Sequence, residues 1–449
     1  MTGGILRSRR VVVGDAVLPA AIHIRHGRIS RVGAWEDTPP GADLEDVGDL
    51  VVMAGLVDTH VHINEPGRTH WEGFATATRA AAAGGVTTLM DMPLNSVPPT
   101  TTLAGLAAKI AAATGKLHVD VGFCGGLVPG NAGELHALRR MGALAFKCFL
   151  SPSGVDEFPH VDTEALRAGM RALAGTGATL LVHSELPGPL SDAERRHRAA
   201  DPRDYHAWLD VRPPEAECEA VDLLLRLVAG TGAKAHVVHL SAARALPLLR
   251  RARDERLSLS AETCPHYLHF TAEGVPTGAT AYKCAPPIRE ATNRERLWEA
   301  LREGLISQVV TDHSPAEPAI KCVDSGDFIA AWGGIASLQL GLAAVWTEAR
   351  ARGFGLAEVS RWMSAAPAAL VGLDGRKGRI APGLDADFVV WDPEADFTVE
   401  PTRLFHRHAI TPYAGERLRG RVIATYLRGE KVYGPDNHSD PPRGEVLTS

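Results

Sequence analysis

The sequence predicts an α/β protein, a (β/α)8 TIM-like barrel with a small β-sandwich domain built from both chain ends. In the middle of the chain, eight apolar strand-like runs alternate with helix-like segments that are rich in Ala, Leu and Arg and end in glycine. Parallel neighbouring strands need helical crossovers, and eight such units close into a barrel. The two ends of the chain instead alternate apolar and polar residues over short strands separated by turns.

These patterns also place the domain boundaries. Residues 1–53 and 375–434 are predicted to meet as the two parts of the β-sandwich domain, with the barrel over residues 54–374 between them. The remaining segment, 435–449, is polar and Pro-rich, which is typical of a disordered tail.

Composition excludes several classes of protein. The chain has 449 residues, 45% of them apolar, and a net charge of only −6 without a basic run, so it does not suit a nucleic-acid phosphate backbone. It reads as having no signal peptide and no segment that could span a membrane. The cysteines are scattered without a CxxC pair, which favours reduced thiols in a cytoplasmic protein over a cysteine metal site.

The first barrel strand ends in Asp58-Thr59-His60-Val61-His62. Side chains two apart on a strand share a face, so His60 and His62 can point together into the barrel. Two adjacent imidazoles would repel each other if both were charged, and a bound metal is one reason to place them there. Taken alone, the pair is more typical of two polar residues at a strand end than of a metal site.

Lys147 lies in the apolar fourth strand, within LAFKCFL. A lysine is costly to bury unless something pairs with it, and burial lowers its pKa. The neutral amine could then take up CO2 and become a carbamate that bridges two metal ions. Alternatively, the side chain reaches the barrel rim or pairs with an acid.

Three more polar residues end later strands: His183 the fifth, His239 the sixth and Asp312 the eighth. His236 is on the same strand as His239 but three residues earlier, so we assign it to the opposite face and leave it out. Each residue alone is a weak signal. Together with His60, His62 and Lys147, however, they all lie at the carboxyl ends of strands, which form the catalytic face of a barrel.

This ordered set resembles that of the binuclear-metal amidohydrolases, in particular the cyclic amidases that include allantoinases, dihydropyrimidinases and dihydroorotases. The resemblance covers nearly the whole chain. Several segments are similar to the allantoinase branch in particular: HVHINEPGRTHWEGF (60–74), DMPLNSVPPTT (91–101), FKCFLSPSGVDEF (146–158), KCAPPIR (283–289), DHSP (312–315) and GDFIAAWGGIASLQLGL (326–342).

The resemblance implies a role for each residue of the set. His60 and His62 would bind the more buried metal with Asp312, while His183 and His239 bind the second and carboxylated Lys147 (N6-carboxylysine) bridges them. The two divalent metals would be Zn²⁺, with Co²⁺, Mn²⁺ or Fe²⁺ as alternatives. A hydroxide between them would open the hydantoin ring of allantoin to give allantoate. Asp312 would carry the proton from the attacking water to the departing nitrogen. The resemblance also implies a homotetramer.

Candidates for contact with this small-molecule substrate are Asn64, Asn95, Ser153, Ala285 and Gly334. A dihydroorotase would carry an arginine at the position of Asn64 to hold a carboxylate, whereas asparagine suits a neutral amide or ureido group. Asn95 and Ser153 are polar candidates near the mouth that could equally stabilise loops. Ala285 and Gly334 are positions where the family reads the ring through backbone groups.

Two alternatives to an allantoinase remain at this stage. A dihydropyrimidinase or other hydantoinase would be expected to place a tyrosine five residues after the bridging lysine, where this chain has Pro152. A non-catalytic scaffold would normally have lost some of the ligands, all six of which are present.

Overall fold

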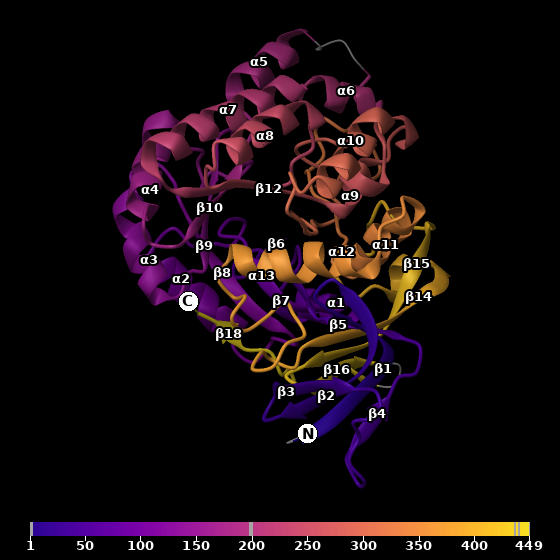
Figure 1. Ribbon diagram of the computed structural model, residues 1–449. Helices are drawn as coiled ribbons and strands as arrows, with labels where there is room; N and C mark the ends of the chain where they lie inside the picture. Colours follow the sequence, from indigo (N-terminus) through magenta and orange to yellow (C-terminus); the bar gives the residue numbers. More distant parts are fainter. Residues whose placement is uncertain (1–2, 197–200, 435–436, 439–440, 449) are drawn as a thin grey trace.

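The computed structural model describes residues 3–196, 201–434, 437–438 and 441–448. A barrel forms the larger part, with a second sheet beneath it in the view of Figure 1. The parallel strands of the barrel follow one another in chain order around its sheet. They are β6 (Leu56–Val61), β7 (Val86–Asp91), β8 (Asp120–Gly126), β9 (Ala145–Phe149), β10 (Thr179–His183), β11 (Lys234–Val237), β12 (Leu259–Thr263) and β13 (Gln308–Val309).

The first and last strands meet and close the barrel. The His62 N–H donates to the His313 carbonyl at 2.8 Å, and Val61 pairs with His313 in a parallel bridge. This closure confirms the predicted (β/α)8 architecture, and strands that bury both faces explain the continuous apolar runs in the sequence.

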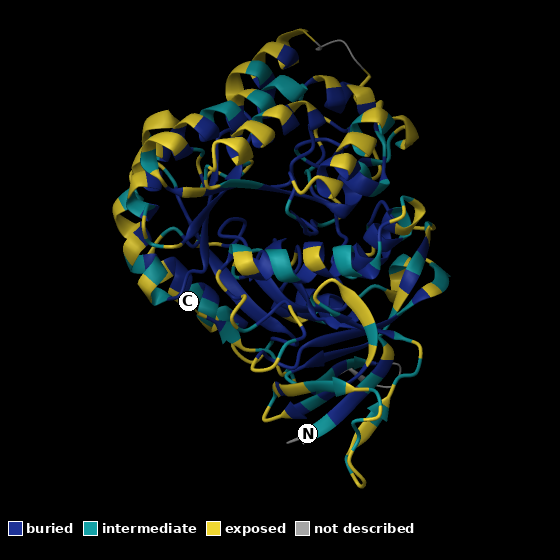
Figure 2. Ribbon diagram, viewed as in Figure 1, coloured by how far each residue is buried: buried dark blue, intermediate teal, exposed yellow. Residues whose placement is uncertain are grey.

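Helices cover the outside of the barrel, with their exposed faces turned outward in Figure 2. In α4 (Thr163–Leu173), Leu166, Met170 and Leu173 recur at helical spacing on the buried side. The side chain of Asp162 caps this helix by accepting the Ala165 N–H at 2.8 Å.

The other α-helices are α1 (Phe74–Ala83), α2 (Leu103–Ala113), α3 (Leu135–Met141), α5 (Pro187–Arg196), α6 (Tyr205–Asp210), α7 (Pro214–Thr231), α8 (Leu246–Asp254), α9 (Pro265–His269), α10 (Ala291–Arg302), α11 (Gly341–Ala351), α12 (Leu356–Ser360) and α13 (Ala366–Leu370). Within the described ranges, none of these helices has the length and apolar character needed to cross a lipid bilayer.

The second sheet joins the two ends of the chain, as the indigo and yellow strands of Figure 1 show. Its N-terminal strands are β1 (Gly3–Val13), β2 (Ala16–Arg25), β3 (Arg28–Ala34), β4 (Leu44–Asp46) and β5 (Val51–Ala54). Its C-terminal strands are β14 (Phe388–Thr398), β15 (Arg417–Leu427), β16 (Glu430–Gly434) and β17 (Asn437–His438). Strand β5 joins the two sets, because it pairs in parallel with β1 and antiparallel with β14.

A buried group of charges ties this sheet to the floor of the barrel. The Lys377 ammonium lies 2.6 Å from Asp120, at the start of β8, and 2.6 and 3.0 Å from Asp387 and Asp385. Arg428, in the turn after β15, also pairs with Asp120 at 2.7 Å. The three carboxylates lie close enough together to suggest a metal site. Because the ammonium lies within hydrogen-bond distance of all three, we interpret the group as an ion-pair network.

The expectation of a disordered tail does not hold for the last part of the chain that the structure describes. Strand β18 (Val446–Leu447) pairs in parallel with the start of β8, and the Gly444 N–H donates to the Leu117 carbonyl at 2.7 Å. Leu447 is buried. The prediction missed Val446 and Leu447, two apolar residues within a polar, Pro-rich segment. They pair with the first part of β8, at positions that β9 does not reach. Residues 435–436, 439–440 and 449 of the predicted tail lie outside the described residues.

Candidate active site

All six predicted metal ligands line one cavity at the carboxyl end of the barrel strands. His60, Lys147 and His183 lie within β6, β9 and β10. His239 and Asp312 follow the ends of β11 and β13, and both have positive φ, 40° and 47°. These backbone turns aim the two side chains into the cavity.

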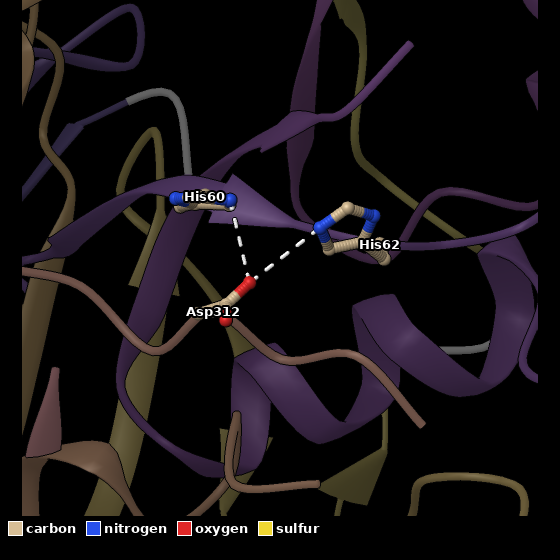
Figure 3. Close-up of side chains that lie close together, drawn as sticks. All are labelled: His60, His62 and Asp312. Carbon is tan, nitrogen blue, oxygen red and sulfur yellow. Dashed lines mark ion pairs between the residues drawn. The ribbon is translucent and has the colours of Figure 1, made fainter. Parts of the chain in front are cut away.

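His60, His62 and Asp312 converge on one point, as Figure 3 shows. The Asp312 Oδ1 atom lies 3.3 Å from His60 Nε2 and 3.5 Å from His62 Nε2. All three side chains are buried, and one donor atom from each lies within 4.8 Å of the others. Burial raises the pKa of Asp312, but the two imidazoles outweigh it and lower the pKa to about 2, so the carboxylate is charged.

His183 and His239 form a second pair of donors. His183 Nδ1 lies 3.1 Å from His239 Nε2, and burial lowers the pKa of both imidazoles. Two neutral imidazoles can therefore direct lone pairs toward a common point, which is a donor arrangement that suits a divalent transition metal. Phe149 stacks on the His183 ring with centroids 4.6 Å apart and holds its plane.

Lys147 lies beside the first group, with its Nζ atom 3.5 Å from His60 Nε2. The side chain is fully buried, and this burial lowers its pKa to about 8. It forms no ion pair within 4 Å among the described residues, and the negative charges of Asp312 and Glu262 offset the effect of burial only in part. A neutral amine in this position is the form that reacts with CO2.

The cavity has a volume of about 230 Å³, enough for a small ring. Four of the five predicted substrate contacts line it: Asn95, Ser153, Ala285 and Gly334. The Ser153 hydroxyl, however, donates to the Phe158 carbonyl at 2.6 Å, so it stabilises its own loop. The Gly334 N–H donates to the Lys283 carbonyl at 2.8 Å and is also already engaged.

The comparisons with known proteins agree with this geometry. A profile of the amidohydrolase family matches residues 51–432. The chain belongs to the amidohydrolase family. It is 52% identical to an allantoinase of Streptomyces avermitilis, over 99% of this chain and 98% of that protein. It is 42% identical to an allantoinase of Arabidopsis thaliana, over 98% and 90% of the two chains.

Among solved structures, the L-hydantoinase (dihydropyrimidinase) of Arthrobacter aurescens superposes on this amidohydrolase with a TM-score of 0.94. The sequence identity is 29% and the whole of both chains is covered. The solved fold is thus shared with hydantoinases, while the sequence similarity to curated proteins favours the allantoinase interpretation over the dihydropyrimidinase alternative.

Two carboxylates and one amide lie behind the histidines of the amidohydrolase site and orient three of the four rings. Glu262 Oε1 lies 2.7 Å from His60 Nδ1, and Glu185 Oε2 lies 2.7 Å from His183 Nε2. The Asn95 side-chain amide lies 3.4 Å from His62 Nδ1. Such partners fix the ring orientation and leave the other nitrogen free for a metal.

Replacing Glu262 with glutamine is expected to weaken metal binding at the site of His60 about 10- to 100-fold, since the ring loses its charged acceptor. Competition with a chelator, followed by metal analysis, measures this change. Glu255→Gln, which changes an exposed carboxylate that pairs with Arg251 at the end of α8, serves as the control. Unchanged metal affinity in Glu262→Gln would contradict the assigned role.

His236 was expected on the opposite face of its strand from His239, and this expectation is wrong. His236 is fully buried, with Nε2 3.0 Å from Glu262 Oε2 and Nδ1 2.6 Å from the Ser260 hydroxyl. It therefore points to the same side as His239, because β11 ends at Val237 and the positive φ of His239 breaks the alternation. His236 supports Glu262 and does not line the cavity.

Asn64 was expected in the cavity but does not line it. Its side-chain amide donates toward the Pro315 carbonyl at 3.4 Å, and its φ of 67° turns the chain after His62. Conversely, sequence reasoning missed cavity residues that lie on helices and loops, away from the strand ends. These are chiefly Trp208, Arg212, Lys283 and Trp332.

Proposed function

We propose that this amidohydrolase hydrolyses allantoin to allantoate. The observation that carries the proposal is the complete set of six donors, brought together in a cavity of about 230 Å³. The 52% identity to a protein named allantoinase, over nearly the full length of both chains, supports this substrate over other cyclic amides.

The donor set fits two divalent metal ions. His60, His62 and Asp312 would hold one ion, and His183 and His239 the other, with a carboxylated Lys147 shared between them. We assign Zn²⁺ to these nitrogen and oxygen donors, and Co²⁺, Mn²⁺ or Fe²⁺ can use the same set. When bound, such ions supply a hydroxide at neutral pH and polarise the carbonyl of the substrate.

Asp312 is the residue of this chain that handles the proton. Its carboxylate is charged, faces the cavity and lies between His60 and His62. It accepts the proton of the attacking water and then donates it to the ring nitrogen as the amide bond breaks. The open ring leaves as a carboxylate that carries two ureido groups.

The cavity wall accounts for substrate choice. Pro152 stands where a dihydropyrimidinase would offer a tyrosine hydroxyl, so that donor is missing from the lining. Asn95 keeps an unpartnered, buried amide oxygen at the cavity and can pair with the N–H groups of a ureido substituent.

Ring opening should be measured on racemic allantoin, dihydrouracil and dihydroorotate, with enzyme loaded with zinc or cobalt in bicarbonate. We expect kcat/KM for allantoin to exceed the others by on the order of 10²-fold or more. A preference for dihydrouracil would instead favour the hydantoinase alternative. Bound metal without turnover of any of the three would point to another cyclic amide, and no metal and no turnover would favour a scaffold.

We also propose that the enzyme is a cytoplasmic homotetramer. All six cysteines are free thiols and four of them are buried, which is consistent with a reducing compartment. Light scattering coupled to size-exclusion chromatography tests the tetramer, and a mass other than four chains would overturn it.

A further inference from the structure

We propose that Arg212 is a positioning residue that sets the metal affinity of the His183–His239 pair by acting through Glu185. The inference rests on the proposed binuclear function and adds a determinant that lies outside the donor set. Arg212 is on the segment between α6 and α7, and nothing in the strand-end pattern of the sequence identifies it.

The contacts form a direct relay. Glu185 lies two residues after His183 and is fully buried. Its Oε2 atom lies 2.7 Å from His183 Nε2 and also accepts a hydrogen bond from Arg212 Nη1. Among the described residues, Arg212 is the one arginine or lysine in ion-pair contact with this carboxylate.

The relay determines which nitrogen of His183 is available to a metal. A carboxylate that accepts from Nε2–H leaves the lone pair of Nδ1 directed at the point it shares with His239 Nε2, 3.1 Å away. A buried carboxylate needs a cation to compensate its charge. Without Arg212, Glu185 would be held less firmly in this orientation.

The two metal positions differ in how they are supported. Glu262, behind His60, is enclosed by His236 and Gln308, which lie 3.0 Å from its Oε2 atom. Arg212, behind His183, keeps 19% of its side chain exposed and lines the cavity. A change at Arg212 should therefore weaken one metal position and leave the other intact.

The surroundings of Arg212 require an arginine. Its guanidinium lies over the Trp208 ring, 4.7 Å from the centroid, while it donates to Glu185. The Trp208 Nε1–H donates to the Cys284 carbonyl at 2.9 Å and so fixes the ring. A planar guanidinium can stack and donate at once, whereas a lysine ammonium offers only a point charge.

The test compares metal binding in the wild type, Arg212→Ala and Arg212→Lys. Metal-free protein is equilibrated with Zn²⁺ against a series of chelator concentrations, and bound zinc per chain is measured. We expect two sites in the wild type. In Arg212→Ala one site should be unchanged and the other should lose about 10- to 100-fold in affinity, with partial recovery in Arg212→Lys.

Two further variants sharpen the result. Arg244→Ala removes an exposed arginine that pairs with Glu215 at 2.5 Å, and it should leave both affinities unchanged. Glu185→Gln keeps the size of the side chain but removes the charge, and it should reproduce the selective loss if Arg212→Ala folds poorly. Far-UV circular dichroism reports on folding in each case.

The outcomes separate this proposal from the proposed function. Suppose that the wild type binds two metals, but that Arg212→Ala and Glu185→Gln weaken both sites equally or weaken neither site. The role of Arg212 is then overturned, and the binuclear function stands. If the wild type itself binds no second metal, the proposed function fails, and this inference fails with it.

Discussion

Lys147→Ala is expected to lower kcat/KM for allantoin by about 10³-fold or more. The variant removes the group that would bridge the two metals, and polarisation by the metal centre contributes several kcal/mol to catalysis. Each 1.36 kcal/mol lost from transition-state stabilisation is about tenfold in rate. Bound metal per chain should fall in parallel, so steady-state kinetics and metal analysis are measured on the same preparation.

The control for this variant is Lys234→Ala. Lys234 is the exposed first residue of β11, so its loss leaves the cavity untouched and should leave activity near the wild-type value. If Lys147→Ala kept both its metals and its activity, a bridging carbamate at this position would be refuted. Mass spectrometry under native conditions adds a direct check, since carboxylation increases the mass of the wild type but not of Lys147→Ala.

Lys377→Ala is expected to lower the free energy of unfolding by about 3–5 kcal/mol, as removal of one partner from a buried ion pair commonly does. Lys377 is 2% exposed and its ammonium contacts the carboxylates of Asp120, Asp385 and Asp387. The variant leaves the three carboxylates buried. Their negative charge is then compensated only by Arg428, which pairs with Asp120, and by Arg376, which pairs with Asp385. Urea-induced unfolding, followed by circular dichroism, measures the change.

Lys431→Ala provides the matched comparison in the same sheet. Lys431 pairs with Glu45 at 2.8 Å, but both side chains are more than one third exposed, and such pairs contribute about 0–1 kcal/mol. A loss below about 1 kcal/mol in Lys377→Ala would mean that solvent reaches the network or that its acids are protonated, contrary to our interpretation.

The metal set could be predicted because barrel strands impose a regular direction on their side chains. His60 and Lys147 lie inside strands, where alternation along the chain assigns the face directly. His239 and Asp312 were placed by their position at strand ends, and they reach the site through positive φ angles beyond those ends that alternation does not predict. Alternation alone misassigned His236 for the same reason.

Other parts of the site left weaker traces in the sequence. Glu262 lies one residue before the end of the seventh strand, in LSLSAET, and a carboxylate in such a run is a usable signal that the strand-end reasoning passed over. Arg212 and Lys283 belong to a helix-connecting segment and a loop, whose place around the cavity depends on tertiary packing. Asn64 was expected at the substrate because of its position after His62, but its left-handed backbone turns its side chain toward Pro315.

The sheet that unites both ends of the chain sets the order in which the protein can mature on the ribosome. Strand β5 emerges with β1, yet its other neighbour, β14, is translated only after the entire barrel. Until then β5 presents an apolar, unpaired edge, VVMA, of the kind that associates with other nascent chains. Completion of the barrel and the arrival of β14 therefore remove an edge that could otherwise pair with another chain.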